Sequence, residues 1–360
     1  MQFSFTEDQE MIRQSVLELV ARACPISEVR AFGQSEAAYS DRLWQDLAGA
    51  GFLGALIPEA HGGSDLGMLE AGIVLEVLGG ALASVPYLST AVAAADLIGR
   101  LGSDTQKAQW LPKIAAGQIS VAVAGWPEAA SVSDDGQIQG NWAPVANAAG
   151  ADLLLVVLND GGGNAQVGVL ENSNADAMVK EFPTMDSTRR FGAIKLTGTV
   201  GECLEKPLDP AGQARLGAIL AAGAAGEMMG GAARAMDMAT SYAKERIQFG
   251  RPIGTFQAIK HMLADQLVAL EGLRSIVWYA LWSIDHAPEE ALLAAVTAKG
   301  VADKVVLQIA SENIQVHGGS GFTTDIDAHL YVKRAQLDRM IWGPPSHHTD
   351  LLEQRLAELA

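Results

Sequence analysis

A segment rich in glycine and alanine, residues 211–246, constrains the fold of this chain more than any other feature. Residues 216–226 within it carry no charge, and Gly230 and Gly231 give the expected helix a smooth face. Glycine inside a helical pattern usually marks close packing. The segment therefore predicts one long helix packed tightly against others. Its uncharged run is shorter than the roughly 20 apolar residues that cross a membrane, and we expect no membrane span.

Two further helices are predicted after this segment. The first spans about residues 256–285 and places apolar residues at helical spacing, namely Ile259, Leu263, Leu267, Leu270, Val277 and Leu281. The second begins at Pro288, because proline is tolerated in a first helical turn and the two glutamates after it suit the positive helix end. It runs towards Val316 and stops at Gly318-Gly319, since glycine commonly ends helices.

Residues 1–117 are also predicted to be helical. Thr6 precedes several acidic residues, which is typical of a helix N-cap with acids in the first turn. An apolar stripe follows at helical spacing, formed by Met11, Ile12, Val16, Leu19 and Val20. Gly62-Gly63 breaks the pattern, a second helix begins near Met68, and the helical pattern continues beyond Pro86.

The pattern changes after residue 117. Four short apolar runs are typical of strands, at residues 119–124, 152–158, 166–170 and 193–199. The turn-forming residues 159–164 separate two of them. The sequence therefore predicts an N-terminal helical domain over residues 1–117, a small β domain over 118–210 and a C-terminal helical domain over 211–360. The expected fold class is mainly α with a small β domain.

Charge and cysteine content narrow the functional classes. The formal net charge is −17, from 25 basic and 42 acidic residues, which argues against nonspecific nucleic-acid binding because that needs a basic surface. Two cysteines, Cys24 and Cys203, are too few for a disulfide framework. The first residues carry neither a basic nor an apolar signal region. We therefore expect a cytoplasmic protein.

Two motifs near the C-terminus carry candidate binding residues. The first reads Arg246-Ile247-Gln248-Phe249-Gly250-Arg251-Pro252 with Gln257 after it, and the second reads Gln315-Val316-His317-Gly318-Gly319. An arginine can pair with a pyrophosphate, a phenylalanine can lie against a ring, and paired glycines let backbone approach a ligand. A glutamine can bond a base edge. Taken singly, each residue is equally consistent with a helix cap, a core aromatic or a glycine stop.

At this spacing the two motifs together resemble those of the acyl-CoA dehydrogenase family. In that family the corresponding stretches of one subunit contact the FAD held mainly by its neighbour. The resemblance implies FAD as cofactor, an acyl-CoA thioester as substrate, no metal, and a C-terminal four-helix bundle. The implied FAD-contact residues are Arg246, Gln248, Phe249, Gln257, Gln315, Gly318 and Gly319. Because CoA esters are anionic and this chain is acidic, a CoA site has to be locally basic.

The resemblance extends over most of the chain. It includes Phe5-Thr6-Glu7-Asp8-Gln9, residues 57–63, Asp186-Ser187-Thr188-Arg189-Arg190 and Lys333-Arg334-Ala335. The β domain departs from the family pattern. Gly125-Trp126-Pro127-Glu128 replaces the usual Thr-Glu-Pro, residues 133–135 replace a Gly-Ser-Asp stretch, and Ala146 replaces a threonine that would hydrogen-bond the flavin. The flavin bed of this chain is therefore predicted to be degraded.

The catalytic carboxylate of the family is missing from both of its usual positions. Counting along the resemblance places Gly343 at the C-terminal position and Leu220 at the alternative one, and neither can take a proton. Glu227 lies about 10 Å further along the same helix. Glu227 stays a candidate catalytic base. The alternative interpretation is that its carboxylate packs between helices or lies at a subunit interface.

Other titratable residues nearby are interpreted as structural. Asp338 is expected on a helix beside Arg339. His347 and His348 are adjacent, so they are not expected to face one metal site. His317 is expected to be packed beside the glycine pair.

The leading hypothesis is a subunit of a heteromeric acyl-CoA dehydrogenase. The resemblance implies an α₂β₂ assembly, as in bacterial enzymes that act on steroid-type side chains, in which a second acyl-CoA dehydrogenase-like subunit supplies the base. It also implies electron-transfer flavoprotein as acceptor. Two alternatives stay open: a homomeric flavoenzyme with a relocated base such as Glu227, and a flavin-free scaffold subunit.

Overall fold

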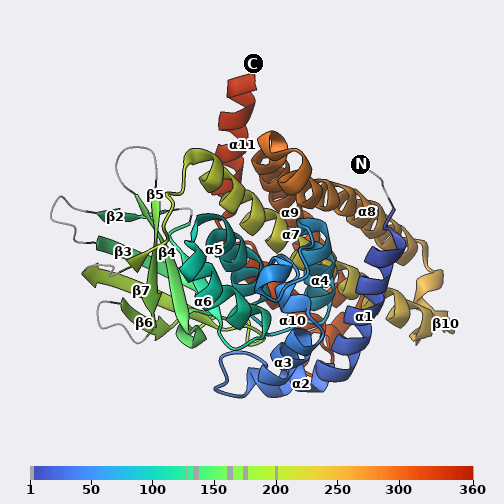
Figure 1. Ribbon diagram of the computed structural model, residues 1–360. Coiled ribbons are helices and arrows are strands. Elements are labelled where there is room, and N and C mark those ends of the chain that lie inside the picture. Colours follow the sequence, from blue (N-terminus) through green and yellow to red (C-terminus); the bar gives the residue numbers. More distant parts are fainter. Residues whose placement is uncertain are drawn as a thin grey trace.

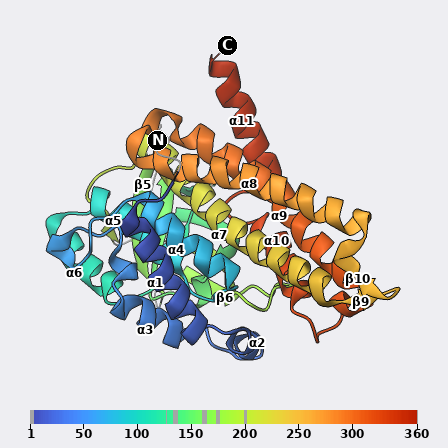
Figure 2. The same cartoon turned by 90° about the vertical axis from the view of Figure 1, so that its right-hand side faces the viewer.

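The structure is a computed structural model that describes residues 4–126, 128–132, 138–159, 165–172, 177–198 and 202–359. Helices make up most of it, and a β-sheet lies at one end of the molecule (Figure 1). The opposite end carries a two-stranded hairpin beside the ends of long helices (Figure 2). The expected fold class, mainly α with a small β domain, is confirmed.

The N-terminal part is a cluster of helices. Their bounds are α1 (Glu7–Ala23), α2 (Ile26–Gly33), α3 (Asp41–Gly49), η1 (Phe52–Gly54), η2 (Glu59–His61), α4 (Met68–Gly80), η3 (Tyr87–Ala94), α5 (Ala95–Leu101) and α6 (Asp104–Ala115). Thr6 caps α1 as predicted, because its hydroxyl accepts from the Gln9 backbone and the Gln9 side chain accepts from the Thr6 backbone.

One expectation for this part was wrong in detail. Met11 is 61% exposed, because Val16 lies five positions further along α1 and so faces a different side of the helix. The helical pattern predicted beyond Pro86 is confirmed: a π-helical segment, η3, leads into α5, and Ser103 then starts α6. The Ser103 hydroxyl caps the new helix by accepting from the Gln106 backbone.

The sheet contains the four predicted strands and others that the sequence did not reveal. The strands are β1 (Val121–Ala124), β2 (Ala130–Val132), β3 (Ile138–Ala146), β4 (Leu153–Asn159), β5 (Ala165–Glu171), β6 (Ala177–Glu181), β7 (Phe191–Gly198) and β8 (Glu202–Cys203). They pair in the order β6-β7-β3-β2-β4-β5-β8, and β1 is parallel to β4. Residues 133–135, 160–164 and 199, on which parts of the sequence analysis rest, lie outside the described residues.

The C-terminal part contains the three long helices that the sequence predicted. The elements are α7 (Pro210–Glu245), β9 (Ile247–Gln248), β10 (Arg251–Pro252), η5 (Ile253–Thr255), α8 (Gln257–His286), α9 (Pro288–His317), η6 (Gly318–Phe322), α10 (Ala328–Asp338) and α11 (Pro345–Leu359). Leu267 belongs to the outer face of α8 and is 46% exposed. The packing of the apolar residues of α8 is therefore less complete than their spacing predicted.

Close helix contact, predicted from the glycines of α7, is confirmed where α7 crosses α4. A Cβ atom added to Gly230 would lie 1.8 Å from the Glu76 carbonyl oxygen, and one added to Gly79 would lie 1.9 Å from the Glu227 carbonyl oxygen. A larger residue at either position would push the helices apart. The crossing keeps most of α7 buried, so this helix forms the centre of the molecule.

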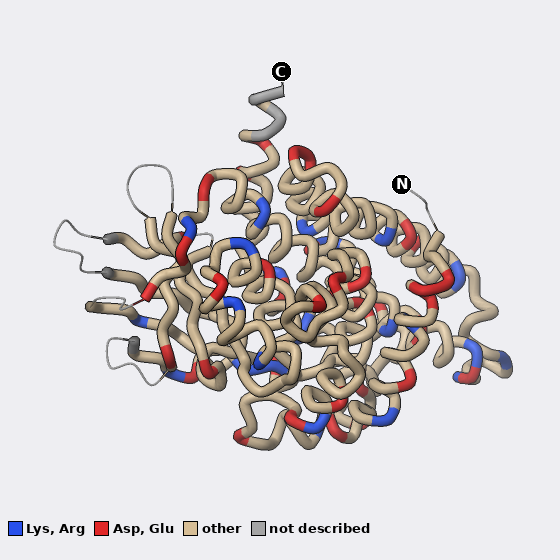
Figure 3. The backbone as a smooth tube through the Cα atoms, in the orientation of Figure 1, with Lys and Arg blue, Asp and Glu red and all other residues tan. Residues whose placement is uncertain are grey.

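By length and hydropathy alone, α7 and α8 could each cross a membrane. In the structure 89% of the apolar window of α7 is buried, as in the core helix of a folded domain, and 44% of the α8 window is buried. Acidic and basic residues are interspersed along the described helices (Figure 3). Cys24 and Cys203 are both free, as expected. The absence of a membrane span and the domain boundaries at 117/118 and 210/211 stay predictions.

Candidate functional site

The two sequence motifs meet at one end of the helical bundle. Arg246 ends α7, with its backbone N–H donating to the Tyr242 carbonyl, and His317 ends α9. The Tyr242 and His317 rings lie 4.2 Å apart, so the two helix ends are side by side. His317 is buried and its Nδ1 lies 2.8 Å from the Asn313 carbonyl oxygen. The prediction that His317 is a packed residue is thereby confirmed.

The β9–β10 hairpin extends from this end of the bundle (Figure 2). Phe249 and Gly250 form its turn, with φ angles of +52° and +79°. A phenylalanine seldom adopts such a left-handed conformation, and the Phe249 side chain is 92% exposed. The Arg251 guanidinium lies 4.3 Å from the centre of the Phe256 ring, which Phe249 meets edge-on at 6.0 Å. These contacts hold the turn while leaving most of Phe249 uncovered.

The remaining predicted FAD-contact residues belong to the same end of the bundle. Those with side chains are all exposed, namely Arg246, Gln248, Gln257 and Gln315. Gly318, with φ of +62°, and Gly319 have open space where a Cβ atom would point. Phe322, 80% exposed, follows them in η6. The structure therefore gathers the seven predicted residues on one surface, and none of them faces the interior.

A different set of residues surrounds an interior cavity between the sheet and the segment after α10. The cavity has a volume of about 220 Å³. Its walls include Ala146 of β3 and three tryptophans, Trp126, Trp142 and Trp342. The pairing of β3 with β7 shifts register between Trp142 and Val145, and such irregularities redirect nearby side chains. This cavity is bordered by the β-domain segments in which the sequence departs from the family pattern.

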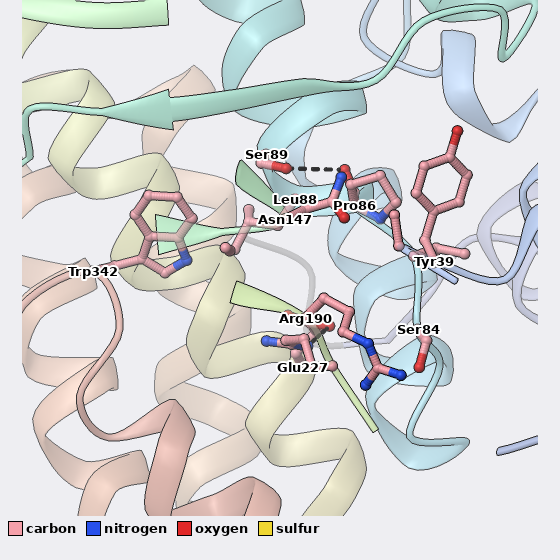
Figure 4. Close-up of a pocket in the computed structure, with 13 residues that line it drawn as sticks. Tyr39, Ser84, Pro86, Leu88, Ser89, Asn147, Arg190, Glu227 and Trp342 are labelled. Carbon is pink, nitrogen blue, oxygen red and sulfur yellow. Dashed lines mark hydrogen bonds and ion pairs between the residues drawn. The ribbon is translucent and has the colours of Figure 1, made fainter. Parts of the chain in front are cut away.

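A second cavity of about 30 Å³, drawn in Figure 4, shares Ala146 and Trp342 with the first. The residues around it come from six parts of the chain and include Tyr39, Pro86, Leu88, Asn147, Arg190, Glu227 and Trp342. Sites for small molecules usually have about 300 Å³ or more. Neither of these two cavities therefore has room for a flavin ring together with an acyl chain.

Trp342 and Ala146 belong to the lining of both cavities. It is 9% exposed, and its backbone has a φ of +58°. Gly343, the position to which the sequence analysis counted, follows with a φ of +105°. His348 Nε2 lies 3.1 Å from the Gly343 carbonyl oxygen. The side chain that reaches the cavities is thus that of Trp342, one residue before Gly343.

A buried network of charges lies beside these cavities. Arg189 pairs with Glu227 and, at 3.2 Å, with Asp338. Arg334 pairs with Asp186 at 2.7 Å and also donates to Thr188. Glu227 is 8% exposed, and its carboxylate pairs with the Arg189 guanidinium at the edge of the smaller cavity. Leu220, the alternative base position, is fully buried.

The pKa values of the two aspartates in this network are shifted in opposite directions. Burial raises the pKa of Asp338 to about 6, although the charges of Arg189 and Arg334 oppose the shift. Burial also acts to raise the pKa of Asp186, but the Arg334 guanidinium and hydrogen bonds from Thr188 lower it below its ordinary value. Asp186 is therefore held charged, whereas Asp338 takes up a proton in mildly acidic solution.

The histidines after the tryptophan support the loop and do not form a metal site. Burial lowers the pKa of His348 to about 3, and the nearby Lys299 charge adds to the effect. His347 and His348 rings lie 5.4 Å apart at a steep angle. Across the part of the chain that the structure describes, no group of three or more His, Cys, Asp or Glu side chains could hold a metal.

Sequence reasoning missed the roles of Arg189, Arg334 and Trp342. Arg189 and Arg334 stand in stretches that resemble the family, and Trp342 directly precedes Gly343, which stands at the usual position of the carboxylate. Arg189 and Asp338 are 149 residues apart, and nothing local indicates which carboxylates an arginine will meet. A tryptophan directly before a glycine at a suspected active-site loop was the one available signal.

Two family models match the chain. The model described as "Acyl-CoA dehydrogenase, N-terminal domain" matches residues 6–118, and the one described as "Acyl-CoA dehydrogenase, C-terminal domain" matches residues 219–357. Acyl-CoA dehydrogenase IpdE2 of Mycolicibacterium smegmatis is 32% identical over 351 residues, covering 97% of this chain and 98% of the relative. IpdE2 of Mycobacterium tuberculosis is 33% identical over 353 residues, covering 98% of each.

Solved structures show the same likeness. The ChsE4-ChsE5 complex from Mycobacterium tuberculosis contains a chain with a TM-score of 0.90 and 28% identity, covering 99% of both chains. The Tcur3481-Tcur3483 steroid ACAD G363A variant gives a TM-score of 0.88 and 29% identity, covering 98% of both. Each of these two structures is named as a pair of components.

Proposed function

The chain belongs to the acyl-CoA dehydrogenase family, and we propose that it is one of two unlike subunits of an FAD-dependent enzyme. The enzyme introduces an α,β double bond into an acyl-CoA thioester. In this proposal the partner subunit supplies the catalytic carboxylate and most of the flavin bed. This chain supplies Arg246, Phe249 and the Gly318-Gly319 backbone across the interface.

The observation that carries the proposal is the separation of the two residue sets. The predicted contact residues are exposed at the end of α7 and α9, while the two cavities beside the sheet measure about 220 and 30 Å³. A flavin and an acyl chain held together beside the sheet would need a larger cavity there. A chain that completes the site of a partner needs only the exposed surface.

The exposed residues suit an extended anionic ligand held between two chains. The Arg246 guanidinium is free to form charge-assisted hydrogen bonds with a pyrophosphate, and the Phe249 ring can lie against an aromatic ring. The absence of side chains at Gly318 and Gly319 lets backbone approach the ligand closely. FAD would supply the electron acceptor of the reaction. The carboxylate that removes the α-proton has no counterpart at Gly343 or Leu220.

The names of the relatives support a bulky substrate. One similar structure is a steroid ACAD, so we include in the proposal an acyl-CoA ester with a steroid-type side chain. The proposal also includes electron-transfer flavoprotein as acceptor and a cytoplasmic location. The substrate class and the acceptor rest on similarity to other proteins.

One observation favours a second candidate, a homomeric enzyme with Glu227 as its base. The Glu227 side chain lines the smaller cavity (Figure 4), and a carboxylate there could reach a small substrate. Its pairing with Arg189 favours a structural role instead, because removing the carboxylate from a buried ion pair leaves an uncompensated guanidinium and is costly. A flavin-free scaffold is the third candidate and predicts a colourless complex.

Co-expression tests the proposal. The chain is produced alone and together with acyl-CoA dehydrogenase-like chains that keep the family carboxylate, and reduction of an artificial acceptor is followed with acyl-CoA esters. We expect turnover only when both chains are present. Turnover by this chain alone would contradict the proposal, and its loss in Glu227→Gln would then assign the base to Glu227.

A further inference from the structure

We propose that Trp342 is the residue that closes this chain's own ring-binding cavity. In this proposal its indole lies between the two cavities beside the sheet. Without the indole they would form one cavity for a planar fused ring. The inference rests on the proposed function, because it explains why the chain contributes only its exposed surface. It concerns a residue that no motif identifies and that can be tested on this chain alone.

The position of the indole carries the first step. Both cavities, of about 220 and 30 Å³, are lined by Trp342 and by Ala146. The alanine methyl group is small, so Trp342 has the larger of these two shared side chains, and its indole is labelled in the lining of the smaller cavity (Figure 4). With 9% exposure, the ring is enclosed by protein. Removing it would join the two cavities and add the volume of the indole itself.

The backbone at Trp342 carries the second step. Its φ of +58° lies in the left-handed region, which costs a large side chain free energy that glycine does not lose. Gly343 continues the turn with φ of +105°, and His348 Nε2 lies 3.1 Å from its carbonyl oxygen. Such strain persists only where the surroundings enforce it. The local fold therefore holds the indole in the cavity despite an unfavourable backbone.

The lining of the larger cavity indicates the class of ligand. Its sheet side carries small residues, Ala124, Gly125 and Ala143, and its other walls include Trp126 and Trp142. Flat aromatic groups and small aliphatic walls suit a planar ring, since aromatic rings pack well in stacked or edge-to-face arrangements. Glu128 is the charged side chain in this lining, which does not favour an anionic ligand. The opened cavity should accept an uncharged fused ring.

The experiment uses the full-length chain without a partner and two probes, lumiflavin and indole. Lumiflavin has the three-ring flavin system without a phosphate tail, and indole matches the group removed in Trp342→Gly. Trp278→Gly is the control, because Trp278 is similarly buried, at 8% exposure, and packs edge-on against Phe5. Binding is followed by quenching of lumiflavin fluorescence and by the thermal shift that each probe produces.

We expect Trp342→Gly to bind lumiflavin at least tenfold more tightly than the wild type does. Trp278→Gly can gain binding of indole but should not bind lumiflavin, because only an indole-sized space is created there. A folded Trp342→Gly that binds indole and not lumiflavin would overturn the inference, as would equal lumiflavin binding by the wild type. If Trp342→Gly does not fold, Trp342→Leu, which keeps an apolar side chain, is tested in its place and should also bind lumiflavin more tightly than the wild type.

The outcome is independent of the proposed subunit role. Failure of lumiflavin to bind Trp342→Gly would remove the explanation for the closed cavity and leave the dependence on a partner untouched. Turnover by the wild-type chain alone would remove the subunit role, whatever the probes do.

Discussion

The hairpin end of the helical bundle and the interior beside the sheet differ in how they are occupied. At the hairpin end Phe249 is 92% exposed, and Gly318 and Gly319 have open space above their backbone. In the interior Trp342 is 9% exposed, and Arg189 pairs with Glu227. The side chains at the hairpin end stay available to another molecule, whereas the side chains in the interior contact one another.

The difference shows how one fold can keep part of a binding function and lose the rest. Apolar and cationic groups that stay largely exposed, such as Phe249, indicate an external partner. Buried charges that satisfy one another imply a closed core. Changes in the interior should therefore alter the stability of this chain, and changes at the hairpin end should alter what it binds.

The largest effect should come from Asp186→Ala. The substitution leaves the Arg334 guanidinium, which is 4% exposed, without its carboxylate, and breaking one side of a buried ion pair typically costs about 3–5 kcal/mol. Urea denaturation measures the loss. Arg13→Ala breaks an exposed pair with Glu10 and should stay within about 1 kcal/mol of the wild type. Similar losses in both variants would mean that the interior network does not stabilise the fold.

Trp342→Gly should destabilise the chain by about 2–3 kcal/mol. Loss of a buried tryptophan costs about 3–5 kcal/mol, and glycine recovers about 1–2 kcal/mol at a left-handed position. Trp278→Gly, in the middle of α8, has no such recovery and adds a glycine penalty of about 1 kcal/mol. If denaturation shows the Trp342 variant to be the less stable of the two, the backbone at Trp342 is not strained.

Arg246→Ala should weaken FAD binding by the heteromeric complex about tenfold to a hundredfold. A hydrogen bond to a charged group contributes about 1.5–3 kcal/mol, and Arg246 is exposed, so its loss should leave the core intact. Flavin released on dilution measures the affinity, and circular dichroism checks the fold. Lys244→Ala removes an exposed charge from the last turn of α7 and serves as the control. Unchanged affinity in Arg246→Ala would exclude this arginine as a flavin contact.

The smallest effect is a dependence on pH. The folded pKa of Asp338 is about 6, above the value of about 3.9 in an unfolded chain. The folded state therefore binds more protons between about pH 4 and 6, and this group's contribution to stability falls as pH rises through that window. The wild type should lose about 1–2 kcal/mol relative to Asp338→Asn between pH 4.5 and 7.

Asp186→Asn gives the matched comparison within the same network. Because its folded pKa is lowered, the stabilisation by Asp186 is present above its unfolded pKa and is lost only as pH falls through the lower folded value. The difference between wild type and Asp186→Asn should therefore stay constant from pH 4.5 to 7. A slope in this difference, or none for Asp338→Asn, would contradict the assigned directions.

The arrangement of residues at the hairpin end could be predicted from the sequence because the sequence signals for it are local. The period of apolar residues and the glycine stop fix where α7 and α9 end, and the short connection between α7 and α8 keeps the motif residues with those ends. The parallel course of α7 and α9 then places Arg246 and Gly318 at the same end. The resemblance to the family predicted FAD as the ligand, and the structure places the motif residues at the same end of the bundle.

The interior could not be read in the same way. Arg189, Glu227 and Asp338 come from three distant segments, so their pairing depends on the tertiary arrangement. Counting from Arg334 reached the correct loop but could not show that the side chain of Trp342 enters the cavities. Strands β2 and β6 are short and lack an apolar alternation that would have revealed them.

The FAD content of the purified heteromeric complex tests the division between the two regions most directly. Native mass spectrometry gives the subunit composition, and absorbance gives the flavin per assembly. Two FAD in an α₂β₂ complex, with none bound by this chain alone, is the predicted result. Four FAD per complex, or a yellow homo-oligomer with one FAD per chain, would show that the interior of this chain holds flavin after all.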